Sequence, residues 1–591
     1  MEFSNNDEVK KYIEQHASQF NEMVKNALHR YMNGAPEQFP PIFDTETMME
    51  NLSNGADVDS SKLLQAHMSF MEKQVELWQN VVKSMTNGEE PCPLIEEDRR
   101  DRRFRDEEWT TNPTFNYFKQ SYLLSSQMLQ DMVDSFNFKD EKTAERIRFY
   151  TRQYINSMSP TNYVLTNPEV CREITETQGQ NLAKGMESFA RDLERSPLEA
   201  LRVTQTDESA FTLGENIANT PGKVVFQNDL IQLIQYSPMT EQVHTTPLLI
   251  VPPFINKYYI LDINEQQSLV RWAVEQGFTT FILSWVNPNQ SLSEKTFSDY
   301  VLEGPVAAID AIEAITGEKK VNAVGYCVGG TLLSTTQAYM LATGDKRIKS
   351  LTFLTTFMDF SDPGEVGVYL SEDTIPTLME HVRSKGYMDG RVLGASFSML
   401  RENSLFWSYF INNYLKGQDP APFDILYWNS DSTNIAAETY CEYIENCYVT
   451  NKLIEPGAVS INGTPISLQD IKTPTYFLST IADHIVPWKA SYKGTQLLSG
   501  PTRFVLAGSG HIAGVINQPG GKYAHWTNDE LPDNADQWFE GATEQEGSWW
   551  PDWQKWLKKH SGKKVPARQP GESTDYPALE EAPGSYVTVR I

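Results

Sequence analysis

Cysteine is scarce in this chain of 591 residues. The five that occur are Cys92, Cys171, Cys327, Cys441 and Cys447. So few thiols argue against a disulfide framework, and their spacing lacks the paired pattern of a zinc site. We therefore expect a reducing compartment such as the cytoplasm. No apolar run reaches the roughly 20 residues of a membrane-spanning helix, and the first residues lack the charged and then apolar plan of a signal peptide.

Basic residues are also in deficit, with 50 Lys and Arg against 78 Asp and Glu, so the formal net charge is −28. This balance disfavours nucleic acid and anionic membrane surfaces as general partners. The chain is too long for one compact core, so we expect two or more domains.

Residues 1–200 have the pattern of amphipathic helices and predict a helical N-terminal domain. Apolar side chains recur at near-helical spacing in two stripes, Leu63, Leu64, His67, Met68, Met71, Val75, Leu77 and Trp78 in one, and Tyr122, Leu123, Met128, Leu129 and Met132 in the other. We interpret the stripes as core or as surfaces for partner helices, and not as a cofactor site. The mixed charge run from Glu96 to Arg103 is interpreted as a solvated loop or helix face.

Residues 201–591 alternate between short apolar strands and helical stretches, which predicts a mostly parallel sheet covered by helices. The strands are expected at residues 247–251, 279–284, 321–324, 349–354, 475–479 and 503–506, with helices such as 265–276 and 300–316 between them. The long aromatic interval at about 357–472 is interpreted as a cap insertion, with extra core packing as the alternative. The tail after Ser561 is rich in Pro, Gly and charge, so we expect it to extend over the surface.

The sequence Gly325-Tyr326-Cys327-Val328-Gly329-Gly330 has the spacing of an α/β-hydrolase nucleophile elbow, with cysteine in place of the usual serine. It follows a predicted strand and precedes a predicted helix. The N-terminus of that helix would favour a negative charge on Cys327 and offer N–H groups to an oxyanion. Cys327 is therefore the predicted nucleophile, and a buried structural cysteine is the alternative.

An elbow nucleophile needs an acid and then a histidine on later loops of the chain. Asp483 follows the predicted strand at 475–479, and His511 follows the one at 503–506. His484 competes for the role of base, but adjacent side chains seldom form the in-line acid–histidine–nucleophile geometry. We therefore predict Cys327, Asp483 and His511 as the catalytic set, and a structural role for His484.

The oxyanion of the reaction needs two backbone donors. The first should be the N–H of Val328, which follows the nucleophile. The second should come from the loop after the strand at 247–251. Its prolines have no N–H, so Ile255 and Asn256 are the candidates.

Together these segments resemble the class I polyhydroxyalkanoate synthases. The resemblance lies in the sequence Pro252-Pro253-Phe254-Ile255-Asn256-Lys257-Tyr258-Tyr259-Ile260-Leu261-Asp262, the elbow, Asn429-Ser430-Asp431-Ser432-Thr433-Asn434, the segments around Asp483 and His511, and Ala582-Pro583-Gly584-Ser585-Tyr586-Val587. It covers roughly residues 90 to 590. One departure is Val286, where the family often has Arg.

The resemblance implies polymerisation of (R)-3-hydroxyacyl-CoA to polyester with release of CoA. It implies that Cys327 is acylated, that His511 is the base, and that Asp483 assists the incoming 3-hydroxyl. It further implies a homodimer on a cytoplasmic polyester granule, with residues 1–200 serving dimerisation and contacts with the granule or its associated proteins. No metal or separate cofactor is expected, because CoA is the leaving group of the substrate.

The residue chemistry favours acyl transfer over hydrolysis. A thiol exchanges with acyl-CoA at little cost, and the resulting thioester keeps enough driving force to acylate a hydroxyl. Two alternatives stay open: a cysteine-dependent thioesterase or polyester hydrolase of the same fold, and a catalytically silent granule-coat or scaffold protein.

Overall fold

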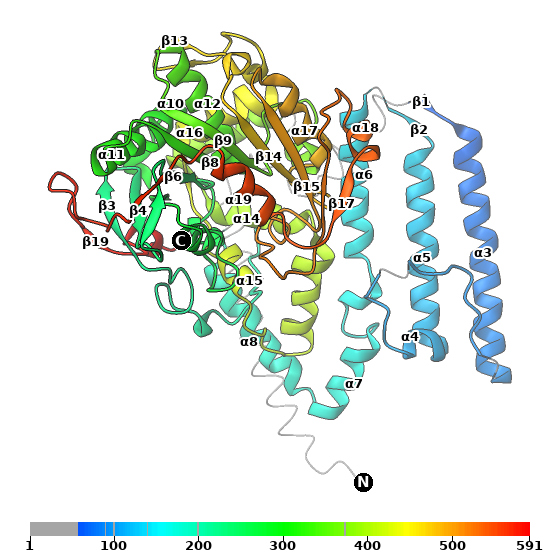
Figure 1. Ribbon diagram of the computed structural model, residues 1–591. Coiled ribbons are helices and arrows are strands. Elements are labelled where there is room, and N and C mark those ends of the chain that lie inside the picture. Colours follow the sequence, from blue (N-terminus) through cyan, green and yellow to red (C-terminus); the bar gives the residue numbers. More distant parts are fainter. Residues whose placement is uncertain (1–56, 89, 99–100, 139, 198–199, 371–373) are drawn as a thin grey trace. The chain divides into compact units, whose positions relative to one another are not determined.

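The computed structural model describes residues 57–591, except 89, 99–100, 139, 198–199 and 371–373 (Figure 1). The chain forms two compact units that divide after Gln205. The first also takes in residues 395–421, from within the interval predicted as a cap, and the second comprises residues 206–394 and 422–591. Residues 1–56 of the predicted N-terminal domain lie outside the described residues. The roles expected for the domains stay predictions.

The first unit is helical. Its helices are α3 (Ser60–Asn87), α4 (Glu108–Thr111), α5 (Pro113–Asp134), α6 (Glu141–Ser157), α7 (Pro168–Thr177) and α8 (Gln180–Arg195), with π-helical turns at η7 (Asn403–Trp407) and η8 (Phe410–Leu415). Strands β1 (Asp57–Val58) and β2 (Phe136–Asn137) pair antiparallel. Short polar residues begin several helices. The Asn112 side chain accepts from the N–H of Thr114, and Pro113 occupies the first helical position of α5.

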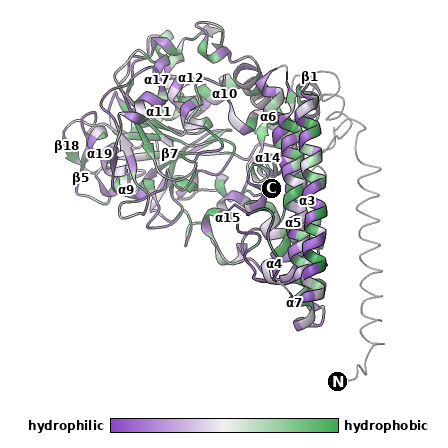
Figure 2. Cartoon of the chain, turned by 90° about the vertical axis from the view of Figure 1, so that its right-hand side faces the viewer, coloured by the Kyte–Doolittle hydropathy of each residue, from purple (hydrophilic) through white to green (hydrophobic). Residues whose placement is uncertain are grey.

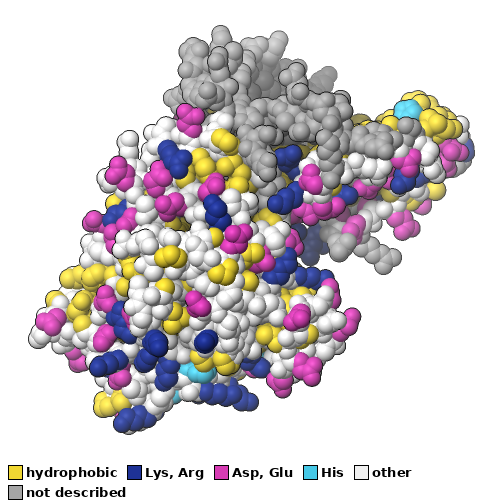
Figure 3. All heavy atoms as spheres, turned by 90° about the horizontal axis from the view of Figure 1, so that it is seen from above, with side chains coloured by type: hydrophobic (Ala, Val, Ile, Leu, Met, Phe, Trp, Pro, Cys, Tyr) yellow, Lys and Arg dark blue, Asp and Glu magenta, His cyan; other side chains and the backbone are white. Residues whose placement is uncertain are grey.

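Helices α3 and α5 lie side by side (Figure 2). One face of α3 is buried through Leu77 and Val81, which pack with Leu124 of α5. Most of the apolar stripe predicted on α3 is instead exposed: Leu64, Met68, Met71, Val75 and Trp78, and with them Val82 and Met85, are 41–63% exposed. Figure 3 shows hydrophobic side chains gathered at the right-hand edge, the side on which Figure 1 draws α3. Of the two interpretations given to this stripe, the outer face of α3 fits the surface and not the core.

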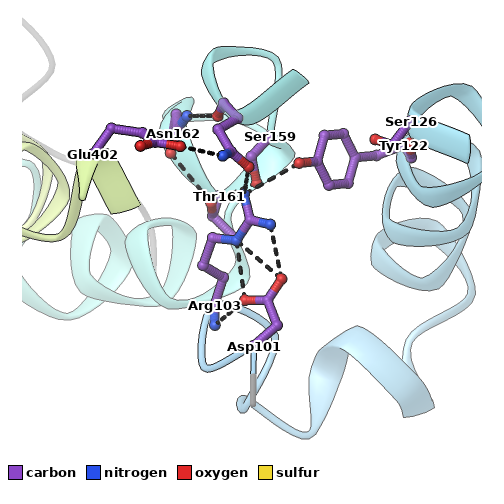
Figure 4. A network of polar contacts seen from close by, with 9 residues as sticks. Asp101, Arg103, Tyr122, Ser126, Ser159, Thr161, Asn162 and Glu402 are labelled. Atoms are coloured by element: carbon purple, nitrogen blue, oxygen red, sulfur yellow. Dashed lines mark hydrogen bonds and ion pairs between the residues drawn. The ribbon is translucent and has the colours of Figure 1, made fainter. Parts of the chain in front are cut away.

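The charge run before α4 is only partly solvated. Glu96, Asp98 and Arg102 are exposed, as expected. The Arg103 side chain is 17% exposed and lies within a polar network (Figure 4). It donates to Asp101, and to the Tyr122 hydroxyl and Asn156 Oδ1 at 3.1 and 3.0 Å. For Asp101 and Arg103 the solvated interpretation is wrong, because a guanidinium with several partners is tolerated inside a helical unit.

The network also reaches the later segment of the first unit. The Asn156 amide donates to Glu402 at 2.5 Å, and Gln153 donates to the carbonyl of Met399 at 2.9 Å. Helix α6 therefore holds residues 395–421 through polar contacts.

The second unit is built on an 11-stranded sheet in the order β17-β16-β15-β14-β9-β8-β6-β7-β4-β3-β19. These strands are β3 (Gly222–Gln227), β4 (Ile231–Tyr236), β6 (Leu248–Val251), β7 (Thr280–Trp285), β8 (Val321–Tyr326), β9 (Ile348–Leu354), β14 (Thr475–Thr480), β15 (Thr502–Ala507), β16 (His525–Thr527), β17 (Thr543–Gln545) and β19 (Glu580–Glu581). The six from β15 to β7 are parallel, and antiparallel pairs extend the sheet on both sides. The predicted fold, an α/β-hydrolase-type and mostly parallel sheet, is confirmed.

Helices cover both faces of this sheet (Figure 1). The helices of this part of the chain are α9 (Leu269–Glu275), α10 (Phe297–Val301), α11 (Ala307–Thr316), α12 (Val328–Ala342), α13 (Ile375–Lys385), α14 (Gly390–Met399), α15 (Asp424–Ser430), α16 (Ala437–Tyr443), α17 (Trp488–Leu497), α18 (Ala535–Glu540) and α19 (Trp550–Lys558). The second half of α14 groups with the first unit. Along β6, Leu249 and Val251 join one buried cluster while Leu248 and Ile250 join the other, as expected for a parallel strand buried on both faces.

All six predicted strands are present, each with small shifts at its ends. The helix predicted at 300–316 is interrupted, because Gly304 has non-helical dihedrals and Pro305 follows it, so α10 and α11 are separate helices. Val286, the departure from the family pattern, packs against the hydrophobic core.

The tail after Ser561 does not simply extend over the surface. Strand β18 (Lys564–Pro566) pairs with β5 (Gln242–His244), and β19 joins the main sheet beside β3. Val587 is fully buried. Two further small pairs, β10 (Tyr387–Met388) with β11 (Ile435–Ala436) and β12 (Ser460–Ile461) with β13 (Thr464–Pro465), lie in the long aromatic interval. Of the described helices, none is long and apolar enough to cross a membrane.

Candidate active site

The turn between β8 and α12 has the strained shape of a nucleophile elbow. Cys327 has φ 53° and ψ −127°, in a region that side chains with a Cβ rarely adopt. A Cβ at Gly325 would lie 2.5 Å from the Cα of Gly330, and one at Gly330 would lie 2.1 Å from the Thr356 hydroxyl. The glycines are thus needed because the backbone passes too close for any side chain.

The predicted acid and base meet on adjacent loops. His511 Nδ1 lies 2.7 Å from Asp483 Oδ2, and His511 also forms a side-chain hydrogen bond with Cys327. Since Nδ1 faces the carboxylate, Nε2 is the nitrogen left for the sulfur. The other oxygen of Asp483 accepts from the N–H groups of Ile485 and Val486, both at 2.9 Å. The fold therefore brings Cys327, Asp483 and His511 together in the order that the sequence predicted.

The electrostatics of this set favour a charged imidazole. Burial by itself would lower the pKa of His511, but the charges of Asp483 and Cys327 and the hydrogen bonds to both raise it to about 10. The Tyr326 hydroxyl donates to the His511 carbonyl at 3.2 Å, and the two rings stack with centroids 5.6 Å apart. His511 is buried, so these contacts are largely shielded from water.

Aromatic side chains line the surroundings of the thiol. Burial raises the pKa of Tyr443 and Tyr448, and the nearby charge of Cys327 adds to this in both. The Tyr448 ring lies 5.6 Å from that of Tyr443 and 4.9 Å from that of Phe360. A small cavity of about 20 Å³ has Tyr443 in its wall, but none of the three predicted catalytic residues.

Sequence reasoning placed these tyrosines only within an aromatic interval and gave them no role. They lie on α16 and the π-helical turn η9 (Ile444–Val449), where the periodic pattern is that of an ordinary buried helix. Cys441 and Cys447 in the same stretch are buried, and burial raises the pKa of both thiols, that of Cys441 to about 11. This agrees with the inert role expected for them.

The loop that should carry the second oxyanion donor begins beside the elbow. Val251, the last residue of β6, is in register with Gly325 of β8. A Cβ at Gly329 would lie 2.4 Å from the Val251 carbonyl, so the loop after β6 begins directly against the first turn of α12. Ile255 and Asn256 lie on this loop, and Val328 is the first residue of α12. Within the described residues, neither loop N–H donates a hydrogen bond.

Comparison with known proteins agrees with this geometry. The model for the poly-beta-hydroxybutyrate polymerase (PhaC) N-terminus matches residues 100–273, and the alpha/beta hydrolase fold model matches residues 246–517. The chain is 43% identical to the poly(3-hydroxyalkanoate) polymerase subunit PhaC of Rhizobium meliloti (strain 1021) over 553 residues, which cover 93% of this chain and 89% of the relative.

The chain belongs to the poly(3-hydroxyalkanoate) polymerase family. It is 45% identical to the poly(3-hydroxyalkanoate) polymerase of Methylorubrum extorquens over 90% of this chain and 88% of the relative. It is 42% identical to the poly(3-hydroxyalkanoate) polymerase subunit PhaC of Cupriavidus necator (strain ATCC 17699 / DSM 428 / KCTC 22496 / NCIMB 10442 / H16 / Stanier 337) over 91% of this chain and 90% of the relative. As a polymerase of this family, the chain is an enzyme of the acyltransferase type.

The pKa of His511 predicts how stability depends on pH. Because this pKa is raised from 6.5 to about 10, the stabilisation is complete below pH 6.5 and is lost as the pH rises through 10. Replacing His511 by Gln should therefore lower the free energy of unfolding more at pH 6.5 than at pH 10, by at least about 1 kcal/mol. Urea unfolding of both proteins across this range measures the difference.

His560 provides the control, because burial and two lysines lower its pKa. Its ordinary pKa is 6.5, so it is half protonated in the unfolded chain at pH 6.5 and almost wholly neutral in both states by pH 8. The effect of His560→Gln should therefore change by less than about 0.5 kcal/mol across the same range, and in the direction opposite to that of His511→Gln. An effect of His511→Gln that is equally constant would contradict the assignment of the ion pair.

Proposed function

We propose that this polymerase joins (R)-3-hydroxyacyl groups from acyl-CoA into polyester, with release of CoA, through a thioester on Cys327. The observation that carries the proposal is the contact of the elbow thiol with His511, which is itself paired with Asp483 at 2.7 Å. A CoA thioester supplies the acyl group, so the reaction needs no further cofactor.

In the first half-reaction the Cys327 sulfur attacks the thioester carbonyl. The carbonyl oxygen becomes an oxyanion, which the N–H of Val328 and one N–H of the β6 loop stabilise. The bond to the CoA sulfur then breaks, and the imidazolium of His511 gives its proton to the departing thiolate. The acyl group is left on Cys327 as a thioester.

In the second half-reaction the hydroxyl of an acceptor acyl group attacks this thioester. His511 takes the hydroxyl proton as the C–O bond forms, the C–S bond breaks, and Cys327 leaves as a thiolate. A hydroxyl is a far weaker acid than a thiol, so this step demands the more basic imidazole that the charge of Asp483 maintains. Asp483 thus assists the 3-hydroxyl through His511, because both of its oxygens already accept hydrogen bonds.

The aromatic groups around Cys327 support transfer to a hydroxyl over hydrolysis, since they exclude water from the thioester. The alternative, a thioesterase or polyester hydrolase, would release free hydroxy acid without polymer. A silent scaffold protein would release no CoA. Incubation with 3-hydroxybutyryl-CoA, with thiol release and insoluble polyester followed together, separates the three.

We further propose that the enzyme is a cytoplasmic homodimer on the surface of its polyester granule. The exposed stripe of α3 supports a pairing with the same helix of a second copy. Its seven members, Leu64, Met68, Met71, Val75, Trp78, Val82 and Met85, are spaced alternately by four and three residues. This period of 3.5 is that of a coiled-coil seam, with Val at two of the three positions where two-stranded coils favour branched residues.

Cys327→Ser should be nearly inactive as a polymerase, with a loss on the order of 10³-fold or more. The serine alkoxide is harder to form, and a serine ester has no driving force for transfer to the next hydroxyl. CoA release and polymer mass measure the loss. Sustained polymer synthesis by the serine variant would refute retention of the acyl group as a thioester.

Substitutions of Asp483 and His511 should slow different steps of the reaction. His511→Gln should slow the first acylation itself, whereas Asp483→Asn should acylate once at an appreciable rate and elongate poorly. Rapid quench of the first equivalent of CoA, followed by steady turnover, measures both phases in each variant. Equal losses in the two phases of Asp483→Asn would leave no separate role for Asp483 in elongation.

The α3 pairing predicts that Met68→Glu with Val75→Glu yields a monomer at concentrations where the parent is a dimer, because four carboxylates would enter the seam. Light scattering coupled to gel filtration measures the mass. Ser69→Glu with Lys83→Gln changes the charge equally at exposed positions beside the stripe, and should leave the dimer intact. A dimer that survives the first pair of substitutions would place the interface elsewhere.

A further inference from the structure

The loop after β6, residues 252–257, is held from outside by a second segment, residues 431–434. Asn256 and Ser432 form an antiparallel bridge, and the N–H of Thr433 donates to the Ile255 carbonyl at 3.4 Å. The Trp428 indole donates to another carbonyl of the loop, that of Lys257, at 2.7 Å. These contacts occupy carbonyl oxygens and leave the N–H groups of Ile255 and Asn256 available.

Asp431 anchors this second segment. Its side chain is fully buried, accepts a hydrogen bond from the Tyr259 hydroxyl at 2.8 Å, and lies 3.6 Å from Arg590 Nε. Burial, reinforced by the charge of Asp431, raises the pKa of Tyr259 well above its ordinary value, so the phenol keeps its proton and remains a donor. A buried carboxylate with such partners fixes them in place, because any movement would leave a charge unpaired.

Residues near the end of the sequence complete the anchor. The Lys257 ammonium donates to the Val589 carbonyl at 2.6 Å, so the loop is tied directly to the residue before Arg590. The Arg590 guanidinium lies over the Tyr427 ring, 4.8 Å from its centroid, and also pairs with Glu208 at 3.4 Å. The loop is thereby fixed at Ile255, at Lys257 and at Tyr259.

We propose that Asp431, with Tyr259 and Arg590, is a positioning residue that sets the β6 loop so that its free N–H groups face the oxyanion formed at Cys327. The inference rests on the proposed function, since it assigns the second oxyanion donor of that reaction to this loop. The site needs such an anchor because an N–H group displaced by about 1 Å costs on the order of 10²-fold in rate.

The test compares Asp431→Asn with a matched control. Asp552 has the same pair of partner types in the same unit: it accepts from the Tyr476 hydroxyl at 3.1 Å and pairs with Arg503 at 2.7 Å. Asp552→Asn therefore removes a charge from the same kinds of partner away from the loop, at a side chain that is 21% exposed where that of Asp431 is fully buried. Two rates are measured in each full-length variant: CoA release from 3-hydroxybutyryl-CoA, and alkylation of Cys327 by iodoacetamide.

Alkylation of the thiol forms no oxyanion, so it reports on Cys327 and His511 alone. It is followed by mass spectrometry on the peptide that holds Cys327, because Cys92 and Cys171 are also free. We expect Asp431→Asn to lower kcat for CoA release about 10- to 100-fold and to leave the alkylation rate within about twofold of the parent. In Asp552→Asn both rates should stay within twofold.

Tyr259→Phe keeps the test decisive if Asp431→Asn fails to fold, because it removes one hydroxyl from the same anchor. In this variant kcat for CoA release should also fall, by less than in Asp431→Asn, while the alkylation rate of Cys327 stays unchanged. Parallel loss of both rates, or no loss of CoA release in either variant, would overturn the positioning role. A parent enzyme that alkylates at Cys327 but releases no CoA would instead overturn the proposed function.

Discussion

The positive φ of Cys327 is the constraint on which the arrangement of the second unit depends. A residue with a Cβ is held at this angle only when the surrounding structure fixes it, and here the surroundings are β8, α12 and the backbone of β6. The close approaches at Gly325, Gly329 and Gly330 bring three chain segments into contact around one sulfur. That packing exposes the thiol to His511 and places the β6 loop at the helix N-terminus.

The charges near this thiol keep the imidazole of His511 protonated. Asp483 is held by two backbone N–H groups, and its negative charge stabilises the protonated imidazole of His511, whose pKa is raised to about 10. His511 and Asp483 are both buried, so water screens the interaction between imidazole and carboxylate only weakly.

The boundary between the two units differs from the one that the sequence pattern predicts. Residues 395–421 lie within the stretch of sequence that forms the second unit, but they group with the helical unit. Asn156 and Gln153 of that unit contact them through hydrogen bonds. The periodicity of the long aromatic interval could not reveal this, because π-helical turns such as η7 and η8 disrupt the regular helical repeat. The burial of Arg103 is hidden from the sequence for a related reason: its partners Tyr122 and Asn156 come from other helices, and a run of charges by itself indicates a solvated surface.

The sequence by itself determined the parallel strands, the elbow and the chain order of Cys327, Asp483 and His511. Each depends on local patterns: short apolar runs, glycines beside a nucleophile, and functional residues just after a strand. Only the tertiary structure decided which face of α3 is exposed and that Asp431, Tyr259 and Arg590 form one anchor. Tyr259 and Asp431 are 172 residues apart, and no local pattern links them. Such contacts form only when closure of the whole sheet brings the loops together, so a single sequence carries no signal for them.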